Sequence, residues 1–386
     1  RRTGPAPGPR GACHLVGDHG AGRTTPLKII QPDSIHRILV RANNWIGDVV
    51  MISPSLRLLR ETYPAAVIDV LARPQVADCF TDHPWVDGLV RHEPAGRHRG
   101  VGGFLRLAAE LRERRYDMAV LFQKAFGAAL TAFAARVPIR VGFGTDMRSA
   151  LLTHAIHETP ELRRIHHVDY FLMVAREAGC RIDGVLRRVY FPLDDDSRAF
   201  ATEFLERYDA GRFAFLAVFA TGASKPPRAW HPERFAHLAG SLAREKSAGI
   251  LVVGGPSDRT DADRVLEAAG AAGIDAVGRT TVRQMAALIE RCRVFVGNDS
   301  GPMHVAAALD VPVLALFGPG TPARTAPYMA PERYVALTAD YPCSPCRQDF
   351  VRECEPASSL KPMCLESIDV RQASAALNAL LVRSAA

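Results

Sequence analysis

The chain has no apolar segment long enough to cross a lipid bilayer. A membrane-spanning helix needs roughly 18–20 consecutive apolar residues, and the longest apolar runs, such as Phe213–Ala220, have only the length of a core strand. Residues 1–33 are rich in glycine, proline, arginine and threonine, and they lack the apolar segment that a secretion signal carries. We therefore expect residues 1–33 to form a disordered tail.

Lysine is scarce, so arginine carries almost all of the formal net charge of +7. Arginine binds phosphate and carboxylate groups through paired hydrogen bonds, and its excess indicates an anionic substrate or an anionic membrane surface. The chain also lacks a basic stripe interleaved with aromatic residues, a recognition-helix pattern and zinc-finger spacing of the C2H2 type. We therefore do not expect nucleic acid as a partner.

A length of 386 residues exceeds what one hydrophobic core usually supports, so two domains are expected. In each half, apolar strands alternate with helices, which is typical of a parallel sheet covered on both faces. The first half begins with a strand over 35–41 and a helix over about 49–63, and a helix over 164–179 follows later. The sequence therefore predicts an α/β protein with two Rossmann-like domains facing a central cleft. These are an N-terminal domain over 34–192, a linker and helix over 193–211, and a C-terminal domain over 212–386.

Small and polar residues follow four strands of the second half, at the edge where ligands bind to parallel sheets. After the fourth strand, Asp299 and Ser300 fall at the start of a short helix, and His304 lies one turn further. Unpaired amides at a helix start attract anions. Together the loops indicate a nucleoside diphosphate site, with Asp258 accepting hydrogen bonds from a ribose, although ordinary turns also favour glycine, serine and threonine. The candidate binding residues are Thr221, Gly222, Ala223, Ser224, Lys225, Arg228, Asp258, Thr280, Asp299, Ser300, Gly301 and His304.

Asp48 follows the first strand of the first half, where a loop opens into a helix. Aspartate is a common helix N-cap, which is one interpretation. The other is a carboxylate that projects into the cleft, since an aspartate that is ionised at pH 7 can take a proton from a hydroxyl. Asn43, Asn44 and Trp45 beside it suit recognition of a sugar.

Two further motifs contain residue types that bind metals. Asp194 and Asp196 have the spacing of metal-dependent sugar transferases, but they precede a helix, where acidic residues favour the helix dipole. We interpret this pair as structural. A cysteine-rich segment over 343–364 begins with the Cys-x2-Cys spacing of a tetrahedral thiolate site. A structural Zn²⁺ is the first interpretation, and disulfides or free thiols are the alternatives; the four residues are Cys343, Cys346, Cys354 and Cys364.

Two segments in this order resemble the signatures of a known enzyme family. Residues 43–54, Asn-Asn-Trp-Ile-Gly-Asp-Val-Val-Met-Ile-Ser-Pro, are similar to the first-loop signature of the lipopolysaccharide heptosyltransferases, family 9 of the glycosyltransferases. Residues 297–308, Gly-Asn-Asp-Ser-Gly-Pro-Met-His-Val-Ala-Ala-Ala, are similar to its nucleotide loop, and residues 316–319 to the turn that follows. The resemblance covers roughly residues 35–382 and is strongest to the heptosyltransferase II branch.

The resemblance implies a GT-B fold with an acceptor-binding domain first and an ADP-sugar-binding domain second. It implies inverting, metal-independent transfer of L-glycero-D-manno-heptose from ADP-heptose to the inner core of a lipid A-linked saccharide. Asp48 matches the catalytic base, and residues 299–304 match the loop that holds the diphosphate and the heptose. Residues 221–223 match the family's first phosphate loop, and Thr280 matches the loop on the adenine side of the site. The family usually has lysine where this chain has Arg228, so Arg228 or Lys225 is expected to bind the phosphate.

The resemblance also implies a monomer in the cytoplasm, with peripheral contact to the inner membrane and no cofactor. Two alternatives to this function stay open: another GT-B sugar transferase or an epimerase, and a non-catalytic protein that binds an ADP-sugar. Five arginines are candidates for binding the acidic acceptor or the membrane. They are Arg41, Arg57, Arg60, Arg140 and Arg148.

Overall fold

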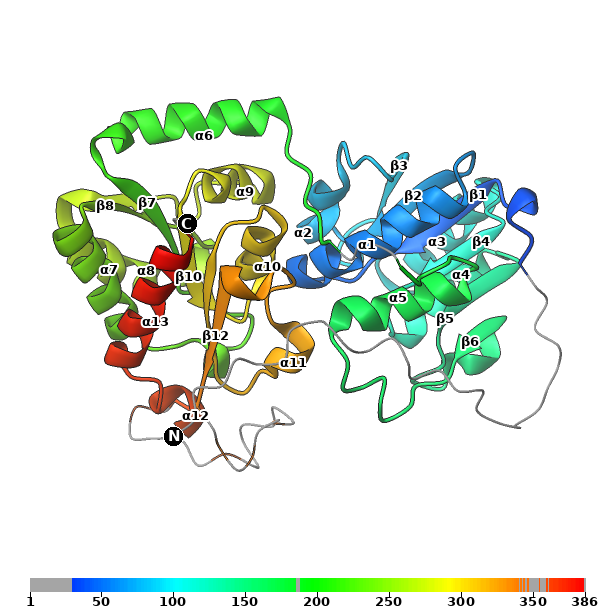
Figure 1. The fold of residues 1–386 in the computed structure, drawn as a ribbon. Helices are drawn as coiled ribbons and strands as arrows, with labels where there is room; N and C mark the ends of the chain where they lie inside the picture. The colour runs from blue at the N-terminus through cyan, green and yellow to red at the C-terminus, as the bar shows by residue number, and fades with distance from the viewer. Residues whose placement is uncertain are drawn as a thin grey trace.

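The chain folds into two α/β lobes, and each lobe is built on a six-stranded sheet (Figure 1). This computed structural model describes residues 30–184, 188–339 and 361–384, together with the single residues 341, 343, 346, 354 and 359. Residues 1–29 of the predicted tail lie outside the described part. The predicted tail is too long, because Ile30 packs against the core of the first lobe and Pro32–Ser34 form a short 3₁₀ turn.

The first lobe has the strand order β3-β2-β1-β4-β5-β6, and every pairing in it is parallel. Its strands are β1 (Arg37–Arg41), β2 (Val67–Ala72), β3 (Gly88–Arg91), β4 (Met118–Leu121), β5 (Ile139–Phe143) and β6 (His154–Ile156). Its helices are α1 (Ile46–Thr62), α2 (Pro74–Ala77), α3 (Gly100–Glu113), α4 (Phe126–Ala134) and α5 (His167–Glu177). Successive strand side chains point to opposite faces: Ile38 and Val40 join the core of α1 and α5, while Leu39 joins that of α3 and α4.

The second lobe repeats this plan with the order β12-β11-β10-β7-β8-β9, again with parallel pairings throughout. Its strands are β7 (Phe215–Ala220), β8 (Ala248–Val252), β9 (Gly273–Asp275), β10 (Val294–Asn298), β11 (Val313–Phe317) and β12 (Tyr334–Thr338). Its helices are α7 (Pro232–Lys246), α8 (Arg259–Ala269), α9 (Val282–Glu290), α10 (Gly301–Ala308), α11 (Pro322–Thr325), α12 (Met363–Glu366) and α13 (Val370–Arg383). Phe219 packs under α7, α8 and α13, whereas Val218 faces α9 and α10. The predicted pair of Rossmann-like sheets is therefore confirmed.

Between the lobes, α6 (Asp195–Arg207) crosses the top of the second lobe and packs against α9 (Figure 1). Asp194 caps α6 by accepting a hydrogen bond from the backbone N–H of Ser197, and it also contacts Arg283. Asp196 is exposed. The structural interpretation of these two aspartates is therefore correct. In the described part of the chain, we find no helix with the length and apolar character needed to span a membrane.

Candidate active site

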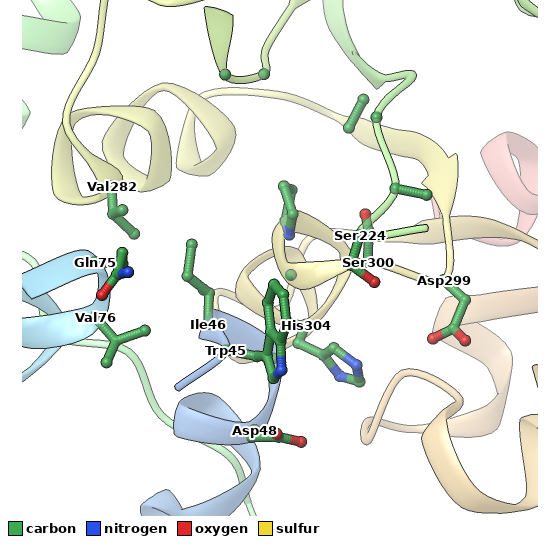
Figure 2. Close-up of a pocket in the computed structure, with 18 of the residues that line it drawn as sticks. Trp45, Ile46, Asp48, Gln75, Val76, Ser224, Val282, Asp299, Ser300 and His304 are labelled. Atoms are coloured by element: carbon green, nitrogen blue, oxygen red, sulfur yellow. The ribbon is translucent and has the colours of Figure 1, made fainter. Parts of the chain in front are cut away.

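A pocket of about 930 Å³ lies between the lobes, among loops that follow strands of both sheets. Asp48 lines it, and so does every predicted donor-site residue except Thr221. Thr221 is buried beneath the pocket, where its carbonyl accepts a hydrogen bond from Asn298. Gln75 and Val76 of the first lobe and Val282 of the second line the same side of this pocket, at the left of Figure 2. The structure thus gathers at one place residues that lie more than 250 positions apart in the sequence.

Asp48 sits in the first turn of α1, and it is not the N-cap. The helix begins at Ile46, three residues earlier than predicted, and Trp45 occupies the cap position without a side-chain hydrogen bond. Burial raises the pKa of Asp48 from 3.8 to about 6, although a hydrogen bond from Asn43 and the charge of Arg228 oppose the rise. The cap interpretation of Asp48 is therefore wrong, and its carboxylate is exceptionally basic for an aspartate.

The starts of α1 and α10 meet at the junction of the two lobes, and glycine makes the contact possible. A Cβ on Gly47 would lie 2.6 Å from the Cδ2 atom of His304, and a Cβ on Gly301 would lie 3.0 Å from the Cβ of Ile46. Either distance is shorter than ordinary van der Waals contact. These two glycines therefore let the positive ends of two helices approach the same point, which favours a bound anion.

Two polar oxygens at the start of α10 have no hydrogen-bond partner among the described residues. Ser300 is the N-cap residue of α10, but its hydroxyl makes no capping bond, and among the described residues it has no other partner. One carboxylate oxygen of Asp299 likewise has no hydrogen-bond partner within the described chain, and it lies 3.6 Å from a guanidinium nitrogen of Arg228. Buried polar groups are normally satisfied, so these oxygens are available to a ligand.

His304 is buried at the centre of this junction, beside Asp48 and Trp45 in Figure 2. Burial, together with the nearby His166 and His167, lowers the pKa of His304 to about 3. Its ring is therefore neutral at pH 7. A neutral imidazole can supply a hydrogen bond to a ligand but no positive charge.

Asn298, at the end of β10, fixes the loop that follows β7. It is fully buried, its Oδ1 accepts a hydrogen bond from the backbone N–H of Trp230, and its Nδ2 donates to the carbonyl of Thr221. In the next loop, the carboxylate of Asp258 accepts a hydrogen bond from the N–H of Gly255. This contact uses one oxygen of the carboxylate, so the hydrogen bonds from Asp258 to a ribose stay a prediction.

A second pocket of about 260 Å³ adjoins the first, and Asp48 and Trp45 line both. Lys124, Tyr170 and Arg324 line it as well. Arg324 comes from the second lobe and donates a hydrogen bond to Nε2 of His167, at 2.6 Å. Burial and the charge of Arg324 lower the pKa of His167 to about 3, so its neutral ring can accept this bond.

The sequence did not single out Arg73, Lys124, His167 or Arg324 as site residues. Arg73 and Lys124 follow β2 and β4, so the rule that ligands bind at the carboxyl ends of parallel strands could have found them. No comparable signal exists for His167 and Arg324, because they meet only when the lobes come together.

The five arginines suggested for acceptor or membrane binding all contact other parts of the chain. Arg41 and Arg148 are buried and donate to backbone carbonyls, Arg41 to Leu71 at 2.9 Å and Arg148 to Phe143 at 2.7 Å. The other three also make intramolecular contacts: Arg57 with Glu61, Arg60 with Asp87, and Arg140 with the carbonyl of Leu151. Burial of Arg41 and Arg148 contradicts their predicted role, because a buried guanidinium cannot reach a membrane surface. For Arg57, Arg60 and Arg140 the role stays a prediction.

The cysteine cluster is only partly visible, since most residues between Cys346 and Cys364 lie outside the described part of the chain. Burial, together with the nearby Cys343, Cys354 and Cys346, raises the pKa of the Cys364 thiol to about 11, so the four side chains share one region. Within the described residues, however, no three histidine, cysteine or acidic side chains are arranged as a metal site.

Comparison with known proteins gives consistent results. The family model for glycosyltransferase family 9 (heptosyltransferase) matches residues 104–355. Lipopolysaccharide heptosyltransferase 2 of Salmonella typhimurium is 30% identical over 318 residues, which cover 79% of this chain and 89% of that protein. Among solved structures, ADP-heptose lipopolysaccharide heptosyltransferase II of E. coli superposes with a TM-score of 0.74 at 26% identity, covering 91% of this chain and 100% of the other. A family 9 glycosyltransferase from Veillonella parvula gives a TM-score of 0.78 at 25% identity, covering 90% and 97%.

Proposed function

Since the chain belongs to glycosyltransferase family 9, the heptosyltransferases, we propose that it transfers L-glycero-D-manno-heptose from ADP-heptose to the inner core of a lipopolysaccharide. It is a glycosyltransferase with the GT-B fold. We further propose that it adds the second heptose, as the relatives of heptosyltransferase 2 type suggest. The observation that carries the proposal is that a single basic carboxylate, Asp48, lines both a large pocket and a smaller one beside it.

We assign the large pocket to the donor. The unpaired amides at the start of α10, the hydroxyl of Ser300 and the guanidinium of Arg228 suit the diphosphate. Arg228 is preferred over Lys225 as the phosphate cation because its charge reaches both Asp48 and Asp299. The residues assigned to donor binding remain those predicted from sequence: Thr221, Gly222, Ala223, Ser224, Lys225, Arg228, Asp258, Thr280, Asp299, Ser300, Gly301 and His304.

The chemistry assigned to Asp48 is general base catalysis. Its carboxylate takes the proton from an acceptor hydroxyl as that oxygen bonds to the anomeric carbon of the heptose. The bond from this carbon to the diphosphate breaks at the same time, and ADP leaves from the opposite face, which inverts the configuration. Preorganised donors at the start of α10 and the charge of Arg228 stabilise the negative charge that develops on ADP. A base with a pKa of about 6 is well suited to this step near pH 7.

We assign the smaller pocket to the acceptor sugar. Lys124 and Arg324 bring positive charge to it, and an inner-core acceptor is acidic. Glu158 accepts a hydrogen bond from Lys124 at 3.0 Å, which holds the ammonium group in place beside the pocket. In this proposal, residues 34–192 bind the acceptor, residues 193–211 link the domains, and residues 212–386 bind the ADP-sugar.

Three further features belong to the proposal. Catalysis needs no metal, because Arg228 and helix amides meet the charge of the leaving group; activity should therefore persist in EDTA. The enzyme is a monomer at the cytoplasmic face of the inner membrane. The four cysteines hold a structural Zn²⁺, although the described residues do not form the site, so metal analysis of the purified protein is the test.

The test of the function is ADP release from ADP-heptose with two acceptors. One is lipid A-linked core that carries the first heptose but nothing beyond it, and the other is the same core without that heptose. Turnover on the heptosylated acceptor alone is expected. Turnover on the bare acceptor alone would make this the enzyme of the first heptose addition. No ADP release with either acceptor would refute heptose transfer to the inner core.

The Asp48→Ala variant is the matched control for the catalytic assignment. It should lose transfer while ADP still protects it from thermal unfolding, because the carboxylate acts on the acceptor rather than on the nucleotide. UDP should protect neither form. Loss of transfer and of ADP protection together would contradict the separate roles given to the two pockets.

A further inference from the structure

One large apolar side chain is exposed inside the site itself. The indole of Trp45 is 64% exposed, although it lines both the large pocket and the smaller one. In Figure 2 it stands above Asp48 and next to His304. Tryptophan is highly buried on average, because its large apolar surface gains free energy when it leaves water. A tryptophan left open where two pockets meet is therefore a candidate for contact with a ligand.

The helix that Trp45 begins gains nothing from a tryptophan at this position. Trp45 is the N-cap of α1, where short polar side chains are preferred because they accept a hydrogen bond from the first turn. An indole cannot accept such a bond, and Trp45 makes no capping bond. Among the described residues, its ring also pairs with no other aromatic ring and with no cation. A residue that departs from a local preference without a gain in stability points to a function.

The loop that carries Trp45 is fixed by its other side chains. Asn43 donates a hydrogen bond to Asp48. The Oδ1 atom of Asn44 accepts one from the guanidinium of Arg41 at 3.4 Å, and Arg41 is itself buried and bonded to backbone carbonyls. The indole therefore stands on a preorganised loop, which lowers the entropy lost when a ligand binds.

The other aromatic hydrocarbon rings of the smaller pocket already have partners. Phe122, Tyr170 and Phe171 line this pocket, and all three are buried. Tyr170 stacks on Phe143 with 3.9 Å between the ring centroids, and Phe122 meets the ring of Phe171 edge to face at 5.9 Å. Among the described rings, that of Trp45 is therefore the one with an open face toward the pocket.

A sugar ring matches an open indole that lies close to a carboxylate. One face of a pyranose carries C–H groups that can cover an aromatic ring, while the hydroxyls reach polar groups around it. Trp45 and Asp48 occupy the N-cap and the third position of α1, which bring their side chains to the same end of the helix. A ring stacked on Trp45 would therefore hold its hydroxyls beside Asp48. The nucleobase of an ADP-sugar lies beyond the diphosphate from the reacting carbon, so it is a poorer match to this position.

We propose that Trp45 is a stacking platform for the pyranose ring of the acceptor, and that it determines which acceptor hydroxyl is turned toward Asp48. Trp45 comes from the first lobe, as do most residues of the smaller pocket, which favours the acceptor sugar over the donor sugar. This inference rests on the proposed function, because that function places the acceptor sugar in the smaller pocket. The contact itself can be measured without turnover.

Tryptophan fluorescence tests the contact directly. The chain has three tryptophans, all within its described part; Trp230 is fully buried, Trp85 is half-buried, and of the three only Trp45 lines either pocket. With the enzyme saturated with ADP, the deacylated heptosylated core should shift the emission to shorter wavelength, because the sugar covers an indole that was in water. ADP alone should give no such shift. The acceptor-induced shift should be absent in Trp45→Phe and retained in the matched control Trp85→Phe.

Steady-state kinetics test the contribution of the contact. Trp45→Ala should raise KM for the acceptor about tenfold, with KM for ADP-heptose unchanged. Trp45→Phe keeps an aromatic face and should recover most of the loss. The melting temperature should not fall in either variant, because the side chain makes no capping bond. Phe126→Ala is the control, since Phe126 is a 45% exposed aromatic residue of the same lobe that lines neither pocket, and it should leave both KM values unchanged.

The outcomes separate this inference from the proposed function. An unchanged acceptor KM in Trp45→Ala would overturn the platform. An emission shift with ADP alone would place the nucleobase on the indole, and a rise in KM for ADP-heptose alone would place the donor sugar there; either result would also overturn it. Absence of turnover by the unmodified protein on both acceptors would refute heptose transfer itself. In that case an emission shift with the core would still support the platform, and no shift would overturn it.

Discussion

The raised pKa of Asp48 predicts an acid limb in the pH profile of the reaction. Burial places this pKa at about 6 instead of 3.8, and only the ionised carboxylate can accept the acceptor proton. With a pKa of about 6, roughly a tenth of the enzyme is active at pH 5, whereas more than about nine-tenths would be active with an ordinary aspartate. We therefore expect kcat/KM for ADP-heptose to fall about tenfold per pH unit below pH 6.

The assay is initial-rate ADP release between pH 4.5 and 8.5, at a saturating concentration of acceptor. Enzyme held at pH 5 and returned to pH 7.5 must recover its full rate, which separates titration from denaturation. A profile that stays flat down to pH 5 would refute the argument, because the carboxylate would then be as acidic as one in water.

Variants of the neighbouring charges make the assignment specific to Asp48. The charge of Arg228 lowers the pKa of Asp48, and that of Asp299 raises it. The acid limb should therefore move to higher pH in Arg228→Gln and to lower pH in Asp299→Asn, whatever these changes do to KM. Shifts in the same direction in both variants would point to another titrating group.

Three other predictions concern stability and donor binding. Because the pKa of Asp48 is raised from 3.8 to about 6 on folding, the loss of stability from its ionisation builds up between these two pH values and is complete above pH 6. Asp48→Asn should therefore raise the melting temperature at pH 7.5, with a gain in the free energy of unfolding of at most about 3 kcal/mol that shrinks toward pH 4.5 in a calorimetric series. Arg228→Met should weaken ADP binding by about 10- to 100-fold in isothermal titration, since it removes a charge-assisted hydrogen bond, while Lys225→Met should have a smaller effect, and the reverse order would exchange their roles. Asn298→Ala leaves a buried N–H of Trp230 unpaired and should cost about 1–3 kcal/mol of stability, together with weaker ADP binding, visible as a lower melting temperature and a smaller ADP shift.

The strands of both cores were predictable because they are short apolar runs separated by polar turns. β1, for example, begins two residues after the start of the range expected for it, 35–41, and ends at the same residue. The strands at the edges of the two sheets were harder to predict. β3 and β6 have only four and three residues, and β12, although mostly apolar, is only partly buried.

In α3 and α4, exposed apolar residues blur the helical pattern. Val101 and Leu105 on α3 and Phe126 and Phe133 on α4 all face solvent, so the apolar positions do not follow one buried face. Helix α1 shows a different limit: Pro54 lies inside it, where proline usually ends a helix, and α1 nevertheless runs from Ile46 to Thr62.

In the site, sequence reasoning worked where one loop carries the signal. In the turn over 297–304, the small residues and the start of the helix are consecutive in the sequence. In the first half, Asp48 likewise lies where a loop opens into a helix. It failed where a property depends on distant residues. Burial lowers the pKa of His304, and so do His166 and His167, which lie more than 130 positions earlier in the chain. Arg324 lines the smaller pocket, where it contacts His167 of the other lobe.

Arg228 links the two halves of the proposed reaction electrostatically. It lies 3.6 Å from Asp299 and lowers the pKa of Asp48, so one cation stabilises two buried carboxylates. A bound diphosphate would compete for the same guanidinium and would add negative charge of its own. Both effects raise the pKa of Asp48, which makes it a stronger base once the donor is in place. The acid limb of kcat, which reports the complex, should therefore lie at higher pH than the limb of kcat/KM, and coincident limbs would show that Arg228 does not exchange partners.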